Sequence, residues 1–299
     1  MYNKSMALLP SQYLNAVISI GTLKDNEKGE KQFRSFATGF LVGKKVNLKD
    51  KQGYRLFVVT NRHVYYNKQK DEYLNHVFFR LNTLEGKSHY FKAFLLNEKQ
   101  KPIWYKHSDE KIDLAVLPIS AKDIEDAKIE FYFFKEEDLF FAKDFIKNDI
   151  STGDDLFVLG FPMSISGNTR NFVIVRKGII ARVDEEILDD GYYYIDAAAY
   201  PGNSGGPVIR KPEIITLEGT KANNSSGLVG VISSGETYSD VAVSQQTGEA
   251  KIVFTEQTGL VRVVPVERIF DIVDELTKPN IDEAKVEVAK KDIVEEGVS

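Results

Sequence analysis

The hydrophobic positions of the chain gather in short runs that are rich in β-branched and aromatic residues. Each run is bounded by clusters of Gly, Asn, Asp or Lys, which is the pattern of antiparallel strands joined by turns. The runs of the first half are residues 16–20, 35–42, 55–60, 76–81, 91–96 and 114–119. Those of the second half are residues 155–161, 171–175, 178–183, 192–197, 207–210, 228–233 and 260–264. The pattern predicts an all-β protein built from two six-stranded units.

A stretch without clear periodicity separates the two units. Residues 120–149 are rich in Asp, Glu, Lys and Phe, and we expect them to form the connection. In residues 266–276 apolar side chains recur at helical spacing, which predicts an amphipathic helix docked on the second unit. The expected organisation is an N-terminal barrel over residues 1–135, a C-terminal barrel with its closing helix over 136–278, and a disordered or loosely helical tail over 279–299.

Composition narrows the classes of protein. With 42% apolar and 28% charged residues in 299 positions, the chain is typical of folded globular proteins. A formal net charge of −5 offers no basic surface to a phosphate backbone, so no nucleic-acid partner is expected. No stretch approaches the roughly 18 apolar residues of a membrane span, and residues 1–10 lack the pattern of a signal peptide. We therefore expect a cytoplasmic protein without a membrane partner.

The chain contains no Cys, which excludes disulfides, thiolate metal sites and a cysteine nucleophile. Any nucleophile must be an oxygen or an amine. His76, His89 and His107 are scattered without the spacing of metal ligands, so neither a metal nor another cofactor is expected.

Residues 201–207 (PGNSGGP) form a glycine-rich turn directly before a short apolar run. Glycines let the backbone bend so tightly that neighbouring amides point the same way. A serine in such a turn can present its Oγ while the N–H groups of Gly202 and Ser204 converge on one point as an oxyanion hole. A plain surface loop is the competing interpretation, because Gly, Asn, Ser and Pro are common in turns.

Two further segments carry residues that would complete such a site. His63 follows the apolar run 55–60, and Asp113 stands at the head of the run 114–119. An ionised Asp at the start of a buried strand is costly unless a donor such as a histidine ring N–H meets it. The order His63, Asp113, Ser204 is that of chymotrypsin-type serine peptidases. Each signal alone has a structural explanation, but together they predict a catalytic triad.

With these segments the chain resembles the trypsin-like peptidase superfamily, and most of all the protease domain of bacterial HtrA (Deg) proteins. The resemblance rests on residues 38–42, the strand leading to His63, and residues 113–117, 159–162, 178–180, 196–207 and 227–235. It implies a chymotrypsin-like fold of two six-stranded antiparallel β-barrels with a C-terminal helix. It also implies a serine endopeptidase that acts on proteins or peptides without a cofactor.

The resemblance assigns a role to each matching residue. Ser204 would be the nucleophile, His63 the general base and then acid, and Asp113 the residue that orients the imidazole. The amides of Gly202 and Ser204 would form the oxyanion hole, in a loop that Asn203 shapes. Attack needs a neutral imidazole, so activity is expected to fall below about pH 6.5, where histidines ordinarily protonate.

The pocket for the substrate residue before the scissile bond is expected between two segments near Ser204. Its lining residues would be Ala198, Ala199, Tyr200, Pro201, Ser233, Ser234 and Gly235. Family members that cut after Arg or Lys carry an Asp at the position of Ala198. Without a charge there, a small or medium apolar residue is the expected preference.

The sequence departs from the HtrA pattern in three ways. We expect no PDZ domain after the protease region and no signal peptide before it, and we match the loops 163–172 and 236–259 to no segment of that family. The oligomers and substrate delivery of that family are therefore not carried over. Two alternatives stay open: a protease that a protein partner or peptide activates, and a catalytically silent or latent module that acts as a peptide-binding sensor or scaffold.

Overall fold

Seven strands from the first half of the chain and one from its end form an eight-stranded sheet, whose alternating apolar residues face a core. The computed structural model describes residues 9–48, 51–67, 69–145, 147, 150–213, 225–278 and 291–293. The strands of the sheet are β1 (Val17–Asp25), β2 (Lys31–Leu48), β3 (Lys51–Thr60), β6 (His76–Asn82), β7 (Ser88–Phe94), β8 (Tyr105–Lys106), β9 (Ala115–Ile119) and β16 (Lys291–Ile293). Their order is β16-β7-β6-β1-β2-β3-β9-β8, while β4 (Tyr66–Asn67) and β5 (Glu72–Tyr73) pair separately.

This sheet differs from the closed six-stranded barrel that the sequence predicts for residues 1–135. Closure would need a ladder between the β7 side and the β9 side of the sheet. In the described residues, the segment between β7 and β8 contributes the isolated bridge Leu96↔Pro102, and β8 is two residues long. The free edge of β7 instead pairs with β16, which lies in the predicted tail. The other residues of 279–299 lie outside the described part, so their expected disorder stays a prediction.

The second half forms a closed barrel of six strands in the order β10-β11-β12-β15-β14-β13, which confirms the six-stranded unit predicted there. The strands are β10 (Asp155–Gly160), β11 (Ile174–Arg182), β12 (Tyr193–Asp196), β13 (Pro207–Arg210), β14 (Gly227–Val243) and β15 (Ala250–Pro265). Two details differ from the prediction. The runs 171–175 and 178–183 contribute to one strand, β11, and much of the unmatched insertion 236–259 continues β14 and β15 as a long hairpin.

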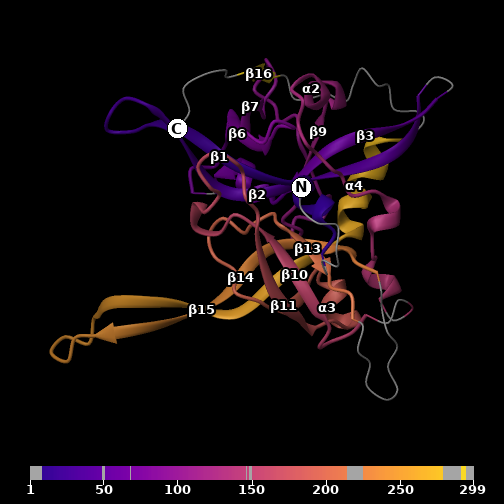
Figure 1. Ribbon diagram of the computed structural model, residues 1–299. Coiled ribbons are helices and arrows are strands. Elements are labelled where there is room, and N and C mark those ends of the chain that lie inside the picture. The colour runs from indigo at the N-terminus through magenta and orange to yellow at the C-terminus, as the bar shows by residue number, and fades with distance from the viewer. Residues whose placement is uncertain are drawn as a thin grey trace.

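Four short α-helices accompany the strands in the described residues: α1 (Arg62–Tyr65), α2 (Ala121–Asp126), α3 (Glu185–Asp189) and α4 (Glu267–Leu276). Helix α2 begins the connection 120–149, and Ser120 caps it by accepting a hydrogen bond from the Asp123 N–H. Helix α4 buries Ile269, Phe270 and Val273, which confirms the predicted amphipathic helix. In Figure 1 the sheet lies above the barrel and α4 lies along one side.

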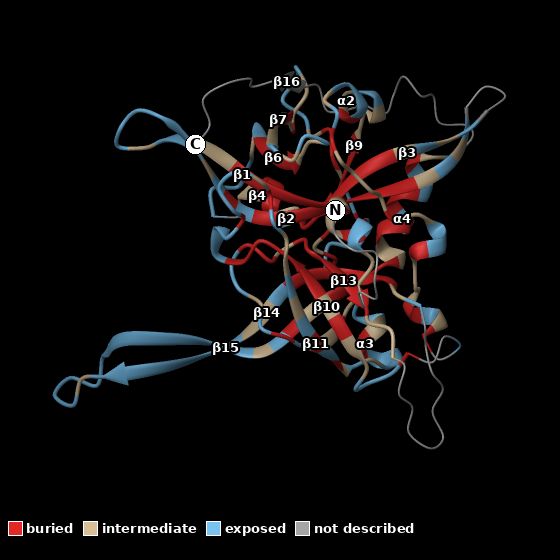
Figure 2. Ribbon diagram, in the orientation of Figure 1, coloured by how far each residue is buried: buried red, intermediate tan, exposed pale blue. Residues whose placement is uncertain are grey.

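The sheet and the barrel share a core. Phe40 and Phe57 of the sheet pack in one cluster with Leu159 and Val231 of the barrel and with Phe270 of α4. Figure 2 shows these buried segments converging between the two halves. Segments far apart in the sequence are thereby held together at the junction where the predicted catalytic residues lie.

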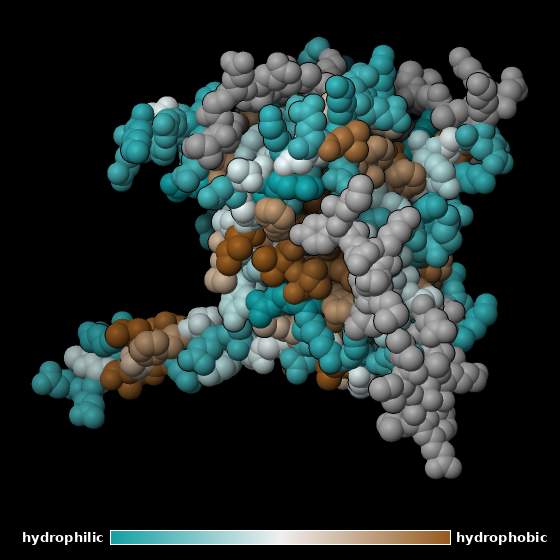
Figure 3. Space-filling view, in the orientation of Figure 1, coloured by the Kyte–Doolittle hydropathy of each residue, from teal (hydrophilic) through white to brown (hydrophobic). Residues whose placement is uncertain are grey.

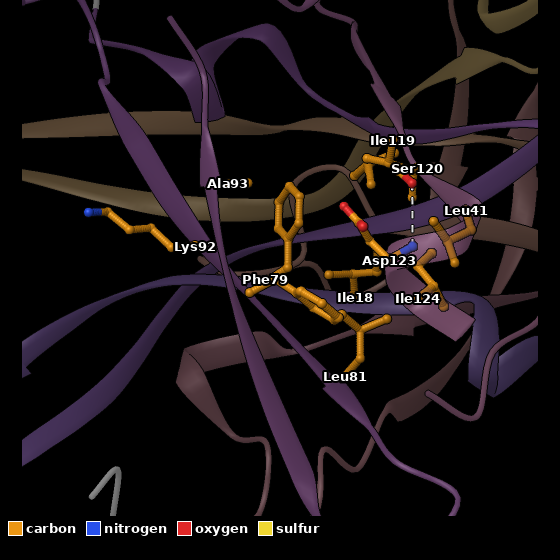
Figure 4. Close-up of a pocket in the computed structure, with 12 residues that line it drawn as sticks. Ile18, Leu41, Phe79, Leu81, Lys92, Ala93, Ile119, Ser120, Asp123 and Ile124 are labelled. Carbon is orange, nitrogen blue, oxygen red and sulfur yellow. Dashed lines mark hydrogen bonds between the residues drawn. The ribbon is translucent and has the colours of Figure 1, made fainter. Parts of the chain in front are cut away.

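A small cavity of about 50 Å³ lies inside the sheet, beneath α2 (Figure 4). Ile18, Phe79 and Leu81 line it from the sheet, and Ile124 lines it from α2. Its lining is mostly apolar and includes none of the predicted catalytic residues. The cavity opens to solvent on one side, so it is an apolar surface cavity of the sheet rather than an enclosed packing void.

Candidate active site

His63 and Asp113 are brought together by the pairing of β3 with β9. Thr60, the last residue of β3, lies opposite Ala115, so the segment after β3 meets the segment before β9. His63 Nδ1 lies 2.5 Å from Asp113 Oδ2, and the His63 backbone N–H donates to Asp113 Oδ1 at 3.1 Å. The Asn61 side-chain amide donates to the Asp113 carbonyl at 2.8 Å and holds the same segment.

The carboxyl group of Asp113 is held in its ionised form. Burial by itself would raise its pKa, but hydrogen bonding and electrostatic attraction from His63, with a smaller contribution from Arg62, lower the pKa below its ordinary value. A carboxylate accepts hydrogen bonds and donates none, so the shared proton sits on Nδ1 of His63. The other ring nitrogen, Nε2, is then left to accept a proton. The His63 side chain is 49% exposed, so a substrate can reach it.

The loop that carries Ser204 is a tight turn. The Asn203 N–H donates to the Tyr200 carbonyl at 2.9 Å across Pro201 and Gly202, and Gly202 has a φ of 102°. Asn203 Oδ1 in turn accepts from the Tyr200 N–H at 3.1 Å. This is a type II turn with proline and glycine at its centre, where the positive φ favours glycine.

Two N–H groups of the loop have no acceptor among the described residues. The N–H groups of Asn203, Gly205 and Gly206 each donate to a backbone carbonyl. Those of Gly202 and Ser204 donate to none. An oxyanion hole requires N–H groups that are held in position and not already engaged.

The directions of these two N–H groups are set by bonds to the preceding carbonyls. The Met163 N–H donates to the Pro201 carbonyl at 2.7 Å, and the Gly206 N–H donates to the Asn203 carbonyl at 2.9 Å. The C=O and N–H of a trans peptide point in opposite directions, so holding the carbonyl also sets the direction of the N–H that follows. No local pattern in the sequence points to Met163, because this contact joins two loops.

Thr38 of β2 ties the same loop to the N-terminal sheet. Its hydroxyl donates to the Gly202 carbonyl at 2.6 Å and accepts from the Phe161 N–H at 3.1 Å, while its N–H donates to the Ser204 carbonyl at 2.9 Å. Thr60 Oγ1 donates to the Thr38 carbonyl at 2.8 Å. Sequence analysis did not single out either threonine. The available signal was a hydroxyl in an apolar strand, which needs a partner when buried.

Ser204 therefore lies at the same junction as His63 and Asp113. A Cβ on Gly205 would clash with atoms of Thr38 and Thr60, so the loop packs directly against the end of β3. His63 follows Thr60 by three positions. The described residues show no hydrogen bond between Ser204 Oγ and His63.

Comparison with known proteins agrees with this arrangement. The family model described as "Trypsin-like peptidase domain" matches residues 37–213, more than half of the chain, and the match contains His63, Asp113 and Ser204. The chain belongs to the trypsin-like peptidase domain family.

Two curated relatives place this trypsin-like domain near the HtrA-type proteases, which confirms the resemblance seen in the sequence. A "Probable periplasmic serine endoprotease DegP-like" of Rickettsia prowazekii (strain Madrid E) is 33% identical over 102 residues, 34% of this chain and 17% of the relative. A protein of the same name from Chlamydia trachomatis serovar D is 25% identical over 222 residues, 74% of this chain and 35% of the relative. The chain thus spans about a third or less of the length of these relatives.

Part of the predicted substrate-binding set of the trypsin-like domain lines a pocket beside Asp113. Ser233 and Ser234 of β14 contribute to this pocket of about 470 Å³. The other lining residues are Lys111, Asp190, Gly191, Tyr192, Arg262 and Val264. The pocket therefore combines an acidic group of the candidate triad with polar groups of the barrel.

The other predicted pocket residues lie elsewhere. Residues 198–201 run from β12 into the Ser204 turn and do not line this pocket. Ala198 and Tyr200 are exposed, and the guanidinium of Arg176 lies 5.1 Å from the centroid of the Tyr200 ring. Gly235 lies against the Gln257 side chain at the base of the long hairpin.

The unmatched loop 163–172 is anchored by a buried arginine. Arg80 of β6 is 3% exposed and donates to Ser166 Oγ and the Gly167 carbonyl, both at 2.8 Å, and to the Asn168 carbonyl at 2.9 Å. Burial lowers the pKa of this guanidinium. The sheet thus holds the loop whose first residue, Met163, bonds to Pro201.

The described residues contain no group of three or more His, Asp or Glu side chains that could hold a metal ion. His107 Nε2 instead lies 3.2 Å from Asp271 Oδ2 of α4. No described helix is both long and apolar enough to cross a membrane. The cytoplasmic location expected from the sequence stays a prediction.

Proposed function

We propose that the chain is a serine endopeptidase that cleaves proteins or peptides through an acyl-enzyme on Ser204. The observation that carries this proposal is the pair of N–H groups on Gly202 and Ser204, which meet no acceptor among the described residues and lie at the same junction as the His63–Asp113 pair. A nucleophile, a base with its orienting carboxylate, and an oxyanion hole are the parts that acyl transfer needs.

In this mechanism Ser204 Oγ attacks the carbonyl carbon of the substrate and passes its proton to Nε2 of His63. Asp113 keeps the imidazole in the required tautomer and stabilises the imidazolium that forms. The carbonyl oxygen becomes an oxyanion and accepts hydrogen bonds from the Gly202 and Ser204 N–H groups. His63 then gives the proton to the leaving amine, and a water molecule, activated by the same imidazole, releases the acyl group.

For specificity we propose cleavage after small or medium apolar residues. Support comes from the short uncharged side chains of Ala198 and Ala199, which precede the Ser204 turn. A peptide library with one varied residue before the scissile bond would test it. Preferred cleavage after Arg or Lys would contradict it.

The proposed activity is tested by a fluorophosphonate probe and intact-mass measurement. Only a serine activated by a base and an oxyanion hole reacts quickly, so we expect the unmodified protein to gain one label and Ser204→Ala to gain none. Ser151→Ala, which changes an exposed turn, is the matched control and should label as the unmodified protein does. Absence of label on every variant, both for the purified chain and in cell extract, would contradict the proposal, and so would equal label on Ser204→Ala.

Activation by a protein partner stays a prediction. To test it, the rate of fluorophosphonate labelling is measured for the purified chain alone and after addition of an extract of the cells that produce it. A rate that rises in extract would support a protease that is latent when alone, and an equal rate would speak against it.

A further inference from the structure

The β14–β15 hairpin extends far beyond the barrel. Its strands pair from Thr237↔Gln257 to Val243↔Ala250, and Figure 1 shows the hairpin projecting away from the body of the molecule. We call the part formed by residues 237–257 the arm. All residues of its two paired strands are exposed.

The arm exposes an unusual number of large apolar side chains. Val253 is 59% exposed, Phe254 53% and Tyr238 48%, and Val241, Val243 and Ile252 are similarly open. Figure 3 shows this concentration of apolar residues on the projecting hairpin. An isolated two-stranded ribbon is only marginally stable in water, and exposed apolar patches mark interaction sites. Among the described residues, none covers the apolar side chains of the arm.

The strand register divides the arm into two chemically different faces. Directly paired residues share a face, so one face carries Tyr238 with Glu256, Asp240 with Phe254, and Ile252 opposite Ala242. We call it the Tyr238 face. It combines aromatic and aliphatic side chains with two carboxylates. The opposite face carries Thr, Ser, Gln and Val residues. Lys251, the basic residue of the paired strands, has no cross-strand partner and lies at the register shift near the tip.

The arm is continuous with the proposed peptide site. Strand β13 pairs with β14 as far as Val231, and the Gly205 N–H of the Ser204 loop donates to the Ile232 carbonyl at 2.9 Å. From Ser233 to Val243 the described residues place no strand on this side of β14. This free edge of residues 233–243 would span about 35 Å at about 3.3 Å per residue.

The base of the arm is fixed to the barrel. Glu236 forms an ion pair with Arg262 and accepts a hydrogen bond from the Tyr194 hydroxyl at 3.3 Å. The Thr258 hydroxyl donates to the Glu236 carbonyl at 3.0 Å. The arm therefore begins at a defined place beside Ser233 and Ser234.

We propose that the arm is a docking surface for an extended, apolar polypeptide segment that carries Lys or Arg and that belongs to the substrate. The segment would add as a third strand along the free edge of β14, with its basic side chains near Asp240 and Glu256. The proposal deepens the proposed function, on which it rests, by naming a second contact for the substrate outside the cleft: an apolar segment with basic residues that binds the arm.

The charges of the arm favour this occupant over a second copy of the chain. If two arms stacked through their Tyr238 faces, four carboxylates, those of Asp240 and Glu256 of each copy, would share one interface, and the Tyr238 face offers no basic side chain to offset them. A basic segment turns the same two carboxylates into attractive contacts. The test therefore treats self-association as an opposing outcome.

Binding is measured on the Ser204→Ala chain, so that the ligand is not cut. The probe is a fluorescent peptide of about sixteen residues with alternating Val and Phe and two Lys, titrated by anisotropy. We expect Tyr238→Ser combined with Phe254→Ser to weaken its Kd about tenfold. Asp240→Lys should weaken it several-fold, while Glu249→Lys, which reverses the same charge in the turn at the tip, should leave it unchanged.

Equal affinity of all arm variants for the peptide would overturn the proposal. So would a dimer of the unmodified chain in analytical ultracentrifugation that the Tyr238 and Phe254 substitutions abolish. Fluorophosphonate labelling reports separately on catalysis. Peptide binding that depends on the arm, without fluorophosphonate labelling, would support the docking surface and contradict the endopeptidase proposal. Labelling without arm-dependent binding would support the endopeptidase proposal and contradict the docking surface.

Discussion

The hydroxyl of Thr38 donates a 2.6 Å hydrogen bond to the carbonyl of Gly202, although the two residues are 164 positions apart. This bond joins the N-terminal sheet to the turn that presents Ser204. The Gly202 carbonyl that Thr38 holds belongs to the peptide bond after Gly202. The Gly202 N–H, which meets no acceptor among the described residues, belongs to the peptide bond directly before it. The geometry of the proposed oxyanion hole thus depends on both halves of the chain.

Replacing Thr38 with Val tests this dependence. The substitution keeps the shape but leaves the Gly202 carbonyl and the Phe161 N–H without a partner, at about 1–3 kcal/mol for each buried group. We expect a lower free energy of unfolding in denaturant titration and a kcat that falls more than KM rises. Thr22→Val, at a β1 residue with no side-chain hydrogen bond in the described structure, is the control. Loss of stability with an unchanged kcat would contradict a role in positioning the turn.

Gly202→Ala should damage the oxyanion hole directly. Gly202 has a φ of 102°, and a Cβ there would also clash with the Phe161 carbonyl. The turn must shift, and loss of one oxyanion donor typically costs about 10²–10³ in kcat. Steady-state kinetics measure the effect.

Gly153→Ala is the matched control for that variant. Gly153 has a φ of 99°, and no heavy atom lies within 4 Å of the position that a Cβ would take, so the substitution brings backbone strain without a clash. We expect a cost of about 1 kcal/mol in stability and an unchanged kcat. An equal fall of kcat in both variants would point to general destabilisation.

The pH dependence of activity should follow the imidazole. The pKa of Asp113 is lowered in the fold, so its pairing with His63 stabilises the fold at any pH above the ordinary Asp pKa of about 3.9. This stabilisation is lost only as the pH falls through the lowered pKa. Asp113 therefore keeps its charge between about pH 5 and 8, where histidines ordinarily titrate. We expect kcat/KM to fall on the acid side with the slope of one proton, while circular dichroism stays constant. A flat rate over this range would exclude His63 as the base.

Arg80→Met tests the anchoring of the loop 163–172. Without the guanidinium, the Gly167 and Asn168 carbonyls and the Ser166 hydroxyl lose a donor, at about 1–3 kcal/mol for each group left buried. Met163 should then hold the Pro201 carbonyl less firmly, so the rate of fluorophosphonate labelling should fall. Arg80→Lys should restore little, because the three N–H groups of an ammonium leave from one nitrogen, whereas these acceptors contact two separate nitrogens of the planar guanidinium.

The control for this variant is Arg182→Met. Arg182 forms exposed ion pairs with Asp184 and Glu186, which water and salt screen, so they contribute little to stability. We expect it to label at the original rate. If Arg80→Met loses stability but also labels at the original rate, the loop does not act through the Ser204 turn.

Local patterns in the sequence were sufficient for the main elements. Alternating apolar runs located the strands of the closed barrel, and helical spacing located α4, because both depend on burying one face of a regular element. The motifs around His63, Asp113 and Ser204 identified the family, since their residue types and order are specific as a set.

Other features depended on contacts between distant segments. Nothing local in residues 1–135 shows that the sheet stays open, because closure depends on which edges meet. The insertion 236–259 gave no sign of a projecting hairpin, since its strands have apolar residues on both faces and no core to bury them.

The sequence by itself determined the element types, the family and the identity of the candidate triad, because each follows from residue type and short-range spacing. The tertiary structure alone decided how Thr38, Met163 and Arg80 hold the Ser204 turn. Hydrogen bonds across more than a hundred residues leave no periodic trace in the chain, and they form only when the sheet and the barrel pack together.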